Sequence, residues 1–146
     1  MGNGANFFSR DAAGRRSEYK SLAPAKTVNG VKGHLIKKKG DSDVHTNLPF
    51  YANSSDVYFR KNAEGVCQAR LYNGQKTFLD FDWSHTHKNS DGRIFEKGTV
   101  HVQIWKQNSD GTFVRLSKDA RAMNNHEMKK YGPLLKDFCP SVKFRK

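Results

Sequence analysis

Three histidines occur within one short stretch of the chain. His85 and His87 are separated by a single residue, and His101 follows after a short connection. An imidazole titrates near pH ~6.5, so it can remove or deliver a proton at neutral pH. RNA is cleaved without a metal when one group takes the 2′-hydroxyl proton, another protonates the leaving 5′-oxygen, and a cation stabilises the charged phosphorane. We therefore predict a metal-independent ribonuclease centre, without a cofactor, in which these histidines are the acid and base.

Polar and basic side chains adjoin the histidines. Ser84 and Lys88 flank the His-x-His pair, and we include both in the predicted catalytic set, with Lys88 as one candidate for the cation. Arg93 and Lys97 lie in the connection between Lys88 and Gly98. Because such connections often carry binding residues, we expect Arg93 and Lys97 to hold a phosphate of the substrate.

The same stretch contains the ligand types of a metal site. Asp80 and Asp82 come shortly before His85 and His87, and His101 would join them from a neighbouring strand. These ligand types suit zinc or a hydrated magnesium ion. One alternative to the ribonuclease is therefore a metal-dependent DNA nuclease that uses these side chains.

Alternation of apolar and polar residues predicts the strands that position this stretch. In residues 77–83 the apolar side chains share one face, and the aspartates point to the other. Residues 99–106 alternate in the same way, with the valines and Ile104 on the apolar face. If the two strands pair, His101 and Gln103 lie on the polar face with the aspartates. We include Gln103 among the predicted substrate-binding residues.

Further strands flank this pair. Residues 57–60 and 66–72 alternate like strands and are joined by turn residues at 62–65. Asn73-Gly74 favours a tight turn into the next strand, since both positions of a type I′ turn need a positive φ. Residues 112–116 add another strand after an Asn-Ser-Asp-Gly turn. The sequence thus predicts four or five antiparallel strands.

Helices are expected at both ends of this sheet. We expect a turn of helix within residues 17–22, and helix-forming residues follow Ser117 until Gly132-Pro133 stops or bends the run. The segment 34–40 is left open between strand and helix. The predicted fold class is α+β, with a four- to five-stranded antiparallel sheet and with N-terminal and C-terminal helices.

The net charge points to a polyanionic partner. The 146 residues include 26 lysines and arginines against 14 acidic residues, a formal charge of +12, which attracts nucleic acid by releasing its condensed counterions. The excess lies at the ends, since residues 41–128 carry eleven basic and eleven acidic side chains. We expect a basic, partly flexible lead at 1–40 and a single nuclease-like domain at 41–146. A basic nucleic-acid-binding protein without catalysis is a second alternative.

Cysteine spacing and hydropathy argue against two other classes. Cys67 and Cys139 are too far apart in sequence for a CxxC metal clip, so we expect two reduced structural thiols. No apolar run reaches the ~18 residues of a membrane span, and the N-terminus lacks the apolar stretch of a signal peptide. We expect no membrane span, and a chain that acts where it is made or delivered.

Four short motifs resemble those of a known family. They are Ala69-Arg70-Leu71-Tyr72-Asn73-Gly74, Asp80-Phe81-Asp82-Trp83, His85-Thr86-His87-Lys88-Asn89 and the segment from Gly98 to Trp105. Together they resemble the C-terminal toxin domains of bacterial polymorphic and contact-dependent inhibition systems, in the barnase, EndoU, colicin and RelE-like group of ribonucleases. The resemblance covers roughly residues 57–106.

This resemblance implies a ribonuclease toxin. It implies metal-independent cleavage of tRNA or another structured RNA, and a cognate immunity protein that blocks the site. The family's histidines correspond to His85, His87 and His101. Arg70 and Tyr72 fall in the first motif, and we place both among the substrate-binding residues, with Tyr72 as a stacking surface for unpaired bases. The expected location is the cytoplasm of a target cell after delivery, or secretion as part of a larger toxin.

Overall fold

The computed structural model describes residues 6–10, 16–52 and 55–145 of the chain. Within these residues lie twelve strands and one helix. The strands are β1 (Asn6–Arg10), β2 (Arg16–Ser21), β3 (Lys26–Val28), β4 (Val31–Lys38), β5 (Tyr51–Ala52), β6 (Val57–Asn62), β7 (Gly65–Asn73), β8 (Lys76–Asp82), β9 (His87–Lys88), β10 (Ile94–Phe95), β11 (His101–Gln107) and β12 (Phe113–Arg115), and the helix is α1 (Asn125–Phe138).

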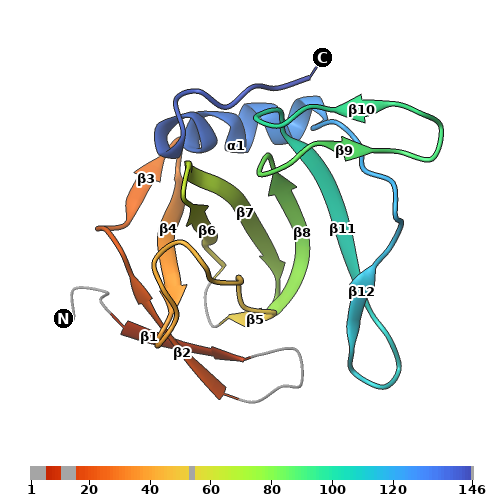
Figure 1. The fold of residues 1–146 in the computed structure, drawn as a ribbon. Coiled ribbons are helices and arrows are strands. Elements are labelled where there is room, and N and C mark those ends of the chain that lie inside the picture. Colours follow the sequence, from red (N-terminus) through yellow and green to blue (C-terminus); the bar gives the residue numbers. More distant parts are fainter. Residues whose placement is uncertain (1–5, 11–15, 53–54, 146) are drawn as a thin grey trace.

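Ten of these strands form one sheet, and seven of the ten close into a ring (Figure 1). Going round the ring, β8 pairs with β5, β5 with β1, β1 with β2, β2 with β4, β4 with β6, and β6 with β7. β7 pairs back onto β8, which completes the circuit. β11 pairs with the C-terminal half of β8, and β12 pairs with β11, so these two strands extend the sheet beyond the ring. β9 and β10 form a separate small hairpin.

The predicted fold class, α+β with a four- to five-stranded antiparallel sheet and a helix at each end, is wrong. The sheet is larger and mixed, because β4 and β6 run parallel. Residues 17–22, expected as a helical turn, fall largely in β2, where Ser17 and Tyr19 are buried and Lys20 is exposed. That alternation is the period of a strand, and pairing with β1 and β4 decides the conformation over any short local preference.

The strands expected between residues 57 and 116 are present. Residues 57–60, 66–72, 77–83 and 99–106 correspond to β6, β7, β8 and β11, and the last predicted strand corresponds to β12. The turn expected at Asn73-Gly74 is shifted by one residue, because Asn73 still pairs with Lys76 and the turn consists of Gly74 and Gln75. Gly74 has a φ of 66° but Asn73 has no positive φ, so the type I′ turn expected at these two residues does not form. The local alternation in this region was therefore a reliable signal for the strands, though not for the turn.

Most of the described part of the segment expected as a basic, partly flexible lead, residues 1–40, belongs to strands of the sheet. β1 and β2 pair with each other, and β2 pairs with β4. β4 then pairs with β6, which belongs to the segment 41–146. The sheet therefore continues across residue 40, while residues 1–5 and 11–15 lie outside the described residues.

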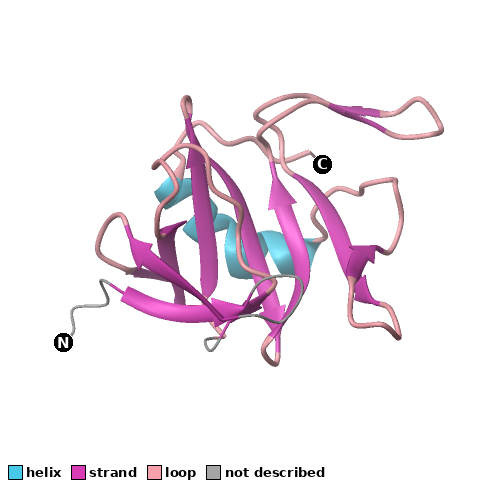
Figure 2. Ribbon diagram, turned by 60° about the horizontal axis from the view of Figure 1, so that its bottom comes forward, coloured by secondary structure: helices cyan, strands magenta, loops and turns pink. Residues whose placement is uncertain are grey.

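Two apolar clusters occupy the two faces of the ring. The outer cluster lies between α1 and strands β6, β7, β8 and β11, as Figure 2 shows for the helix. The inner cluster joins residues from β2, β4, β5, β6 and β7, which are not all neighbours in the sheet, so it lies inside the ring. Phe59 of β6 faces outward and stacks on Phe138 of α1 at 4.0 Å, whereas the adjacent Tyr58 belongs to the inner cluster. Gly33 permits this stack, because a Cβ there would lie 2.8 Å from the Phe59 ring.

The C-terminal helix starts later than the sequence predicts, and it continues through a proline. Asn124 caps it and forms a capping box with Glu127. Pro133, expected to stop or bend the helix, lies inside it. A proline lacks the N–H that would bond the carbonyl four residues earlier, and here the Asn29 side chain donates to that Lys129 carbonyl at 3.0 Å. Among the described residues, no helix is long and apolar enough to cross a membrane.

The capping carboxylate should contribute measurably to stability. Burial alone would raise the pKa of Glu127, but hydrogen bonds from the Arg121 guanidinium and the Asn124 backbone outweigh burial and hold the pKa below its ordinary value of 4.5. We expect Glu127→Gln to lower the free energy of unfolding by about 1 kcal/mol at pH 7. The control is Asp137→Asn, which removes an exposed carboxylate of the same helix and should cost less.

The pH dependence of this effect has a definite sign. A carboxyl group whose pKa is lowered in the folded state stabilises the fold above its unfolded-state pKa, and this contribution is lost as the pH falls through the folded-state pKa. The stability difference between wild type and Glu127→Gln should therefore shrink below about pH 4. Urea denaturation of both proteins between pH 3 and pH 7 measures it. A difference that is constant across this range would contradict the assignment.

Candidate metal centre

The three predicted histidines come together at one end of the β8–β11 pair. His101 begins β11 and pairs in register with Asp82, the last residue of β8. His85 lies in the turn after β8, and His87 begins β9. The His101 ring centroid is 4.9 Å from that of His87 and 5.2 Å from that of His85. The pairing of these two strands, inferred from their alternation, is thus what assembles the cluster.

Exposure differs within the cluster. His101 has a relative exposure of 0%, His87 is half-buried, and the His85 side chain is 54% exposed. Both ring nitrogens of His101, and Nε2 of His87, are buried without a hydrogen-bond partner; they are three of five such side-chain atoms among the described residues. An unpaired buried polar atom costs about 1–3 kcal/mol. The cluster therefore destabilises the fold unless something binds these nitrogens.

His101 is neutral at physiological pH. Burial lowers its pKa to about 4, and the charge of Asp82 opposes this effect only in part. A neutral imidazole keeps one lone pair, which can bind a metal ion. Because His101 has no exposed surface, it has no direct contact with solvent or with a substrate.

Asp82 and Ser84 orient His85. Oδ1 of Asp82 accepts hydrogen bonds from the Ser84 backbone N–H at 2.8 Å and from Ser84 Oγ at 2.6 Å. Ser84 Oγ also lies 2.9 Å from Nδ1 of His85. Since the serine proton is donated to Asp82, the histidine must donate Nδ1–H to the serine oxygen, which leaves its lone pair on Nε2. Ser84, predicted as a catalytic residue, is thus placed to position His85.

Asp80 and Arg70 belong to a different network, inside the ring. Arg70 Nε donates to Asp80 Oδ1 at 2.7 Å and Nη2 donates to Oδ2 at 3.1 Å. Gln68 and Trp105 also donate to Oδ2, at 2.9 Å and 3.0 Å. Asp80 is completely buried, and Arg70 is 5% exposed. The carboxylate expected as a metal ligand, and the guanidinium expected to bind substrate, therefore satisfy each other in the interior.

Two other predicted substrate contacts are also buried. The Tyr72 hydroxyl donates to the Pro49 carbonyl, and its ring packs against Tyr58 in the inner cluster. Gln103 pairs in register with Asp80 and is 8% exposed. Neither side chain offers a surface on which a base of RNA could stack or pair.

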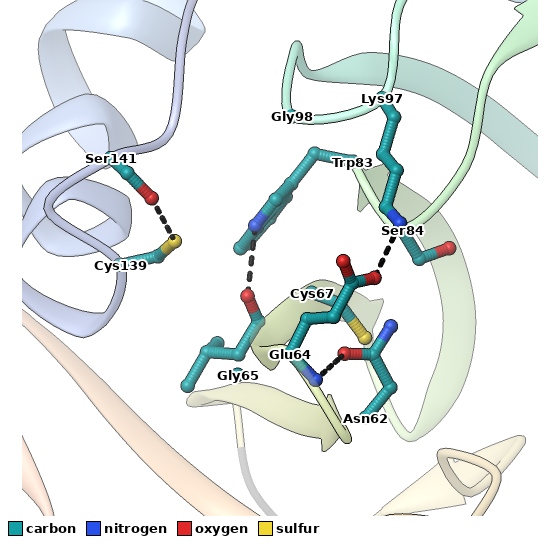
Figure 3. Close-up of a pocket in the computed structure, with 11 residues that line it drawn as sticks. Asn62, Glu64, Gly65, Cys67, Trp83, Ser84, Lys97, Gly98, Cys139 and Ser141 are labelled. Atoms are coloured by element: carbon teal, nitrogen blue, oxygen red, sulfur yellow. Dashed lines mark hydrogen bonds and ion pairs between the residues drawn. The ribbon is translucent and has the colours of Figure 1, made fainter.

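The predicted cations are divided between two places. Lys88 and Arg93 are exposed on the β9–β10 hairpin, which carries His87. Lys97 instead forms an ion pair with Glu64 across a pocket that Ser84 also lines (Figure 3). The two cysteines line this pocket as well and are unpaired; burial raises the pKa of the Cys67 thiol to about 11. Lys88 and Arg93 therefore remain as exposed cations close in sequence to the histidines.

Sequence reasoning missed the residues that hold the hairpin in place. The Asn89 amide donates to the Ala120 carbonyl at 2.8 Å and accepts from the Ala120 N–H at 2.9 Å. Ser90 bonds Asp119 through its backbone N–H and its hydroxyl. These partners are about thirty residues apart in the chain, and no local pattern links them. Through them the hairpin, and His87 with it, is fixed against the segment before α1.

The histidines are also the side chains best placed to hold a metal ion. Their ligand atoms all lie within 4.8 Å of one another, and no other group of three His, Cys, Asp or Glu side chains in the described part of the chain meets this criterion. The metal site considered from the sequence included Asp80 and Asp82 as ligands. In the structure the candidate ligands are the three histidines alone. Asp82 contacts His85 indirectly, through the Ser84 hydroxyl.

Comparisons of the chain with protein-family models, with curated proteins and with solved structures find no match. The resemblance to bacterial toxin domains therefore stays a prediction. What defines the protein at this point is a mostly β fold, closed into a ring, with a three-histidine cluster at one end of the β8–β11 pair.

Proposed function

We propose that this protein is a nuclease whose active site is formed by His85, His87 and His101, and that its favoured substrate is RNA. The observation that carries the proposal is the convergence of three imidazoles whose buried nitrogens have no partner within the protein. Such nitrogens stabilise the fold only when they bind something, and catalytic or metal sites are where proteins accept this kind of cost.

The charge around the cluster supports a polyanionic substrate. Lys88 and Arg93 are exposed on the β9–β10 hairpin. The basic C-terminal segment lies beside the hairpin and the start of β11, at the end of the molecule shown in Figure 1. Its Lys143 backbone bonds Gly98 and Val100, and Arg145 donates to the Ile94 carbonyl at 2.9 Å. The Lys143 backbone and the Arg145 side chain are thus bonded to residues 94–100, which lie between His87 and His101 in the chain, and the charges of these two residues would favour the approach of phosphates.

The burial of His101 bears on how cleavage proceeds. The acid–base route expected from the sequence needs two imidazoles that touch the substrate, and only His85 and His87 have exposed surface. His101 can take part through an ion held by all three rings. Either route leaves RNA as the favoured substrate, since the 2′-hydroxyl supplies an internal nucleophile. The resemblance to toxin domains favours tRNA or another structured RNA.

The test is direct incubation of the purified protein with total RNA and, separately, with plasmid DNA, followed by denaturing gels. We expect discrete RNA fragments from wild type and none from the double variant His85→Ala/His87→Ala. Intact RNA and DNA in all lanes would overturn the proposal. If the intact RNA were nevertheless bound with a steep dependence on salt, the protein would be a nucleic-acid-binding protein without catalysis.

A further inference from the structure

We propose that His85, His87 and His101 bind one divalent transition-metal ion of the zinc type. The role of this ion in cleavage rests on the proposed function, whereas its binding does not. The proposal begins with the buried nitrogens. His101 is completely buried, and its Nδ1 and Nε2 atoms both lack a partner, as does Nε2 of His87. An ion that bound one nitrogen of each ring would relieve much of the cost of burying them.

The spacing of the rings fits such an ion after small movements. Zinc holds an imidazole nitrogen at about 2.0–2.1 Å, so two nitrogens of a tetrahedral site are about 3.4 Å apart. The ligand atoms here lie within 4.8 Å of one another. His85 is exposed and lies in a turn, so it is the ring that can most readily move to close the remaining distance. The more buried His87 and His101 rings stack at 27° between their planes, and since imidazole lone pairs lie in the ring plane, one of these rings must turn about its Cβ–Cγ bond before both can bind one ion.

The surroundings of His85 resemble the outer shell of a metal site. Metal-binding histidines commonly use their second nitrogen to bond a carboxylate or another polar group, which fixes the ring and the tautomer. His85 meets this condition, because its Nδ1 bonds Ser84 Oγ, and Ser84 Oγ donates to Asp82. Nδ1 of His85 also lies 3.6 Å from Asp82 Oδ1. The free nitrogen of His85 is therefore Nε2.

The ligand chemistry selects the class of ion. Imidazole nitrogens suit zinc, copper and nickel, whereas magnesium and calcium prefer oxygen ligands. The nearby carboxylate of Asp82 accepts hydrogen bonds from Ser84, and the carboxylate of Asp80 is paired with Arg70. Three protein ligands with one exposed side leave a position for a further ligand, as in catalytic zinc sites. When bound, a zinc ion would supply a Lewis acid for phosphate oxygens.

The test measures metal binding without any substrate. The full chain is stripped with a chelator, dialysed and titrated with Zn²⁺ in competition with a chromophoric chelator. We expect one equivalent to bind, and we expect His87→Ala to weaken binding by at least about 100-fold, the upper end of the loss seen for an outer-shell partner alone. The matched control is His126→Ala, which removes an exposed histidine of α1 and should leave the affinity unchanged.

Two additions keep the test decisive. If His87→Ala or His101→Ala fails to fold, His85→Ala is the variant to use, because His85 is exposed. Substitution with Co²⁺ gives a visible spectrum whose intensity distinguishes four-coordinate from six-coordinate ions. Less than one equivalent of Zn²⁺, or equal affinity in the cluster variants and in His126→Ala, would overturn the metal site. One bound Zn²⁺ without RNA cleavage would instead uphold the site and refute the nuclease.

Discussion

Replacing Asp80 with alanine is expected to lower the free energy of unfolding by about 3–5 kcal/mol. Asp80 is completely buried and accepts hydrogen bonds from Arg70, Gln68 and Trp105. Arg115 lies 3.5 Å from the same carboxylate. Without the carboxylate, the Arg70 guanidinium would remain buried inside the ring with no counter-charge. Removing one partner of a buried ion pair is costly for this reason, and urea denaturation measures the loss.

A double variant distinguishes two contributions to the free energy of unfolding: the cost of leaving Arg70 buried without a counter-charge, and the net stabilisation by the Arg70–Asp80 pair. Arg70→Met/Asp80→Leu removes both charges, and apolar replacements of a buried pair are often tolerated. We therefore expect the double variant to be more stable than Asp80→Ala. Asp110→Ala, in the exposed turn between β11 and β12, serves as the surface control. A loss below about 1 kcal/mol for Asp80→Ala, in the range of ordinary surface changes, would mean that the Arg70–Asp80 pair does not hold the ring together.

Replacing His87 with alanine is expected to reduce the rate of RNA cleavage by about 10²- to 10⁴-fold. His87 is half-buried, its ring centroid lies 4.9 Å from that of His101, and its Nε2 has no hydrogen-bond partner in the protein. It would serve either as an acid–base group or as a metal ligand, and both roles are lost with the imidazole. His126→Ala, which changes an exposed histidine on α1, should cleave like wild type.

The three histidines should also act as a unit. Removing any member of a catalytic group that works together commonly costs about as much as removing all of them. We therefore expect the triple variant, without His85, His87 and His101, to cleave no more slowly than the least active folded single variant. Rate losses that simply multiply from one variant to the next would contradict a shared centre, and wild-type rates in all single variants would exclude the cluster as the active site.

The strands near the site were predictable because their signals are local. The alternation in β7, β8 and β11, and the glycine of the turn between β7 and β8, are contained in short windows. The ring was not predictable, because it depends on pairings of β1 with β5 and of β4 with β6 that join segments distant in sequence. The parallel β4–β6 pair has no local signature, and β2 was mistaken for helix because its partners lie outside its own window.

Closure of the ring also explains which site residues were misplaced. Alternation put Asp80, Asp82, His101 and Gln103 on one polar face, which in an open sheet would be exposed, and the resemblance placed Arg70 and Tyr72 among the substrate-binding residues. In a closed ring that face turns inward, so Arg70 and Asp80 pair in the interior and Tyr72 joins the inner cluster. His101, at the start of β11, instead meets the histidines of the following turn and hairpin. The sequence therefore predicted which residues share the polar face, but it did not predict that the sheet curves and turns this face inward.

The measurement that tests the central claim most directly is RNA cleavage by protein stripped of metal, with and without one added equivalent of Zn²⁺. If the histidine cluster cleaves RNA through a bound ion, we expect little cleavage in chelator. Added Zn²⁺ should restore cleavage in wild type and in His126→Ala, but not in His87→Ala. Cleavage that persists in chelator but is lost in His87→Ala would contradict a role for the ion in cleavage and favour direct acid–base catalysis. Cleavage that survives in His87→Ala under all conditions would contradict the histidine cluster as the active site.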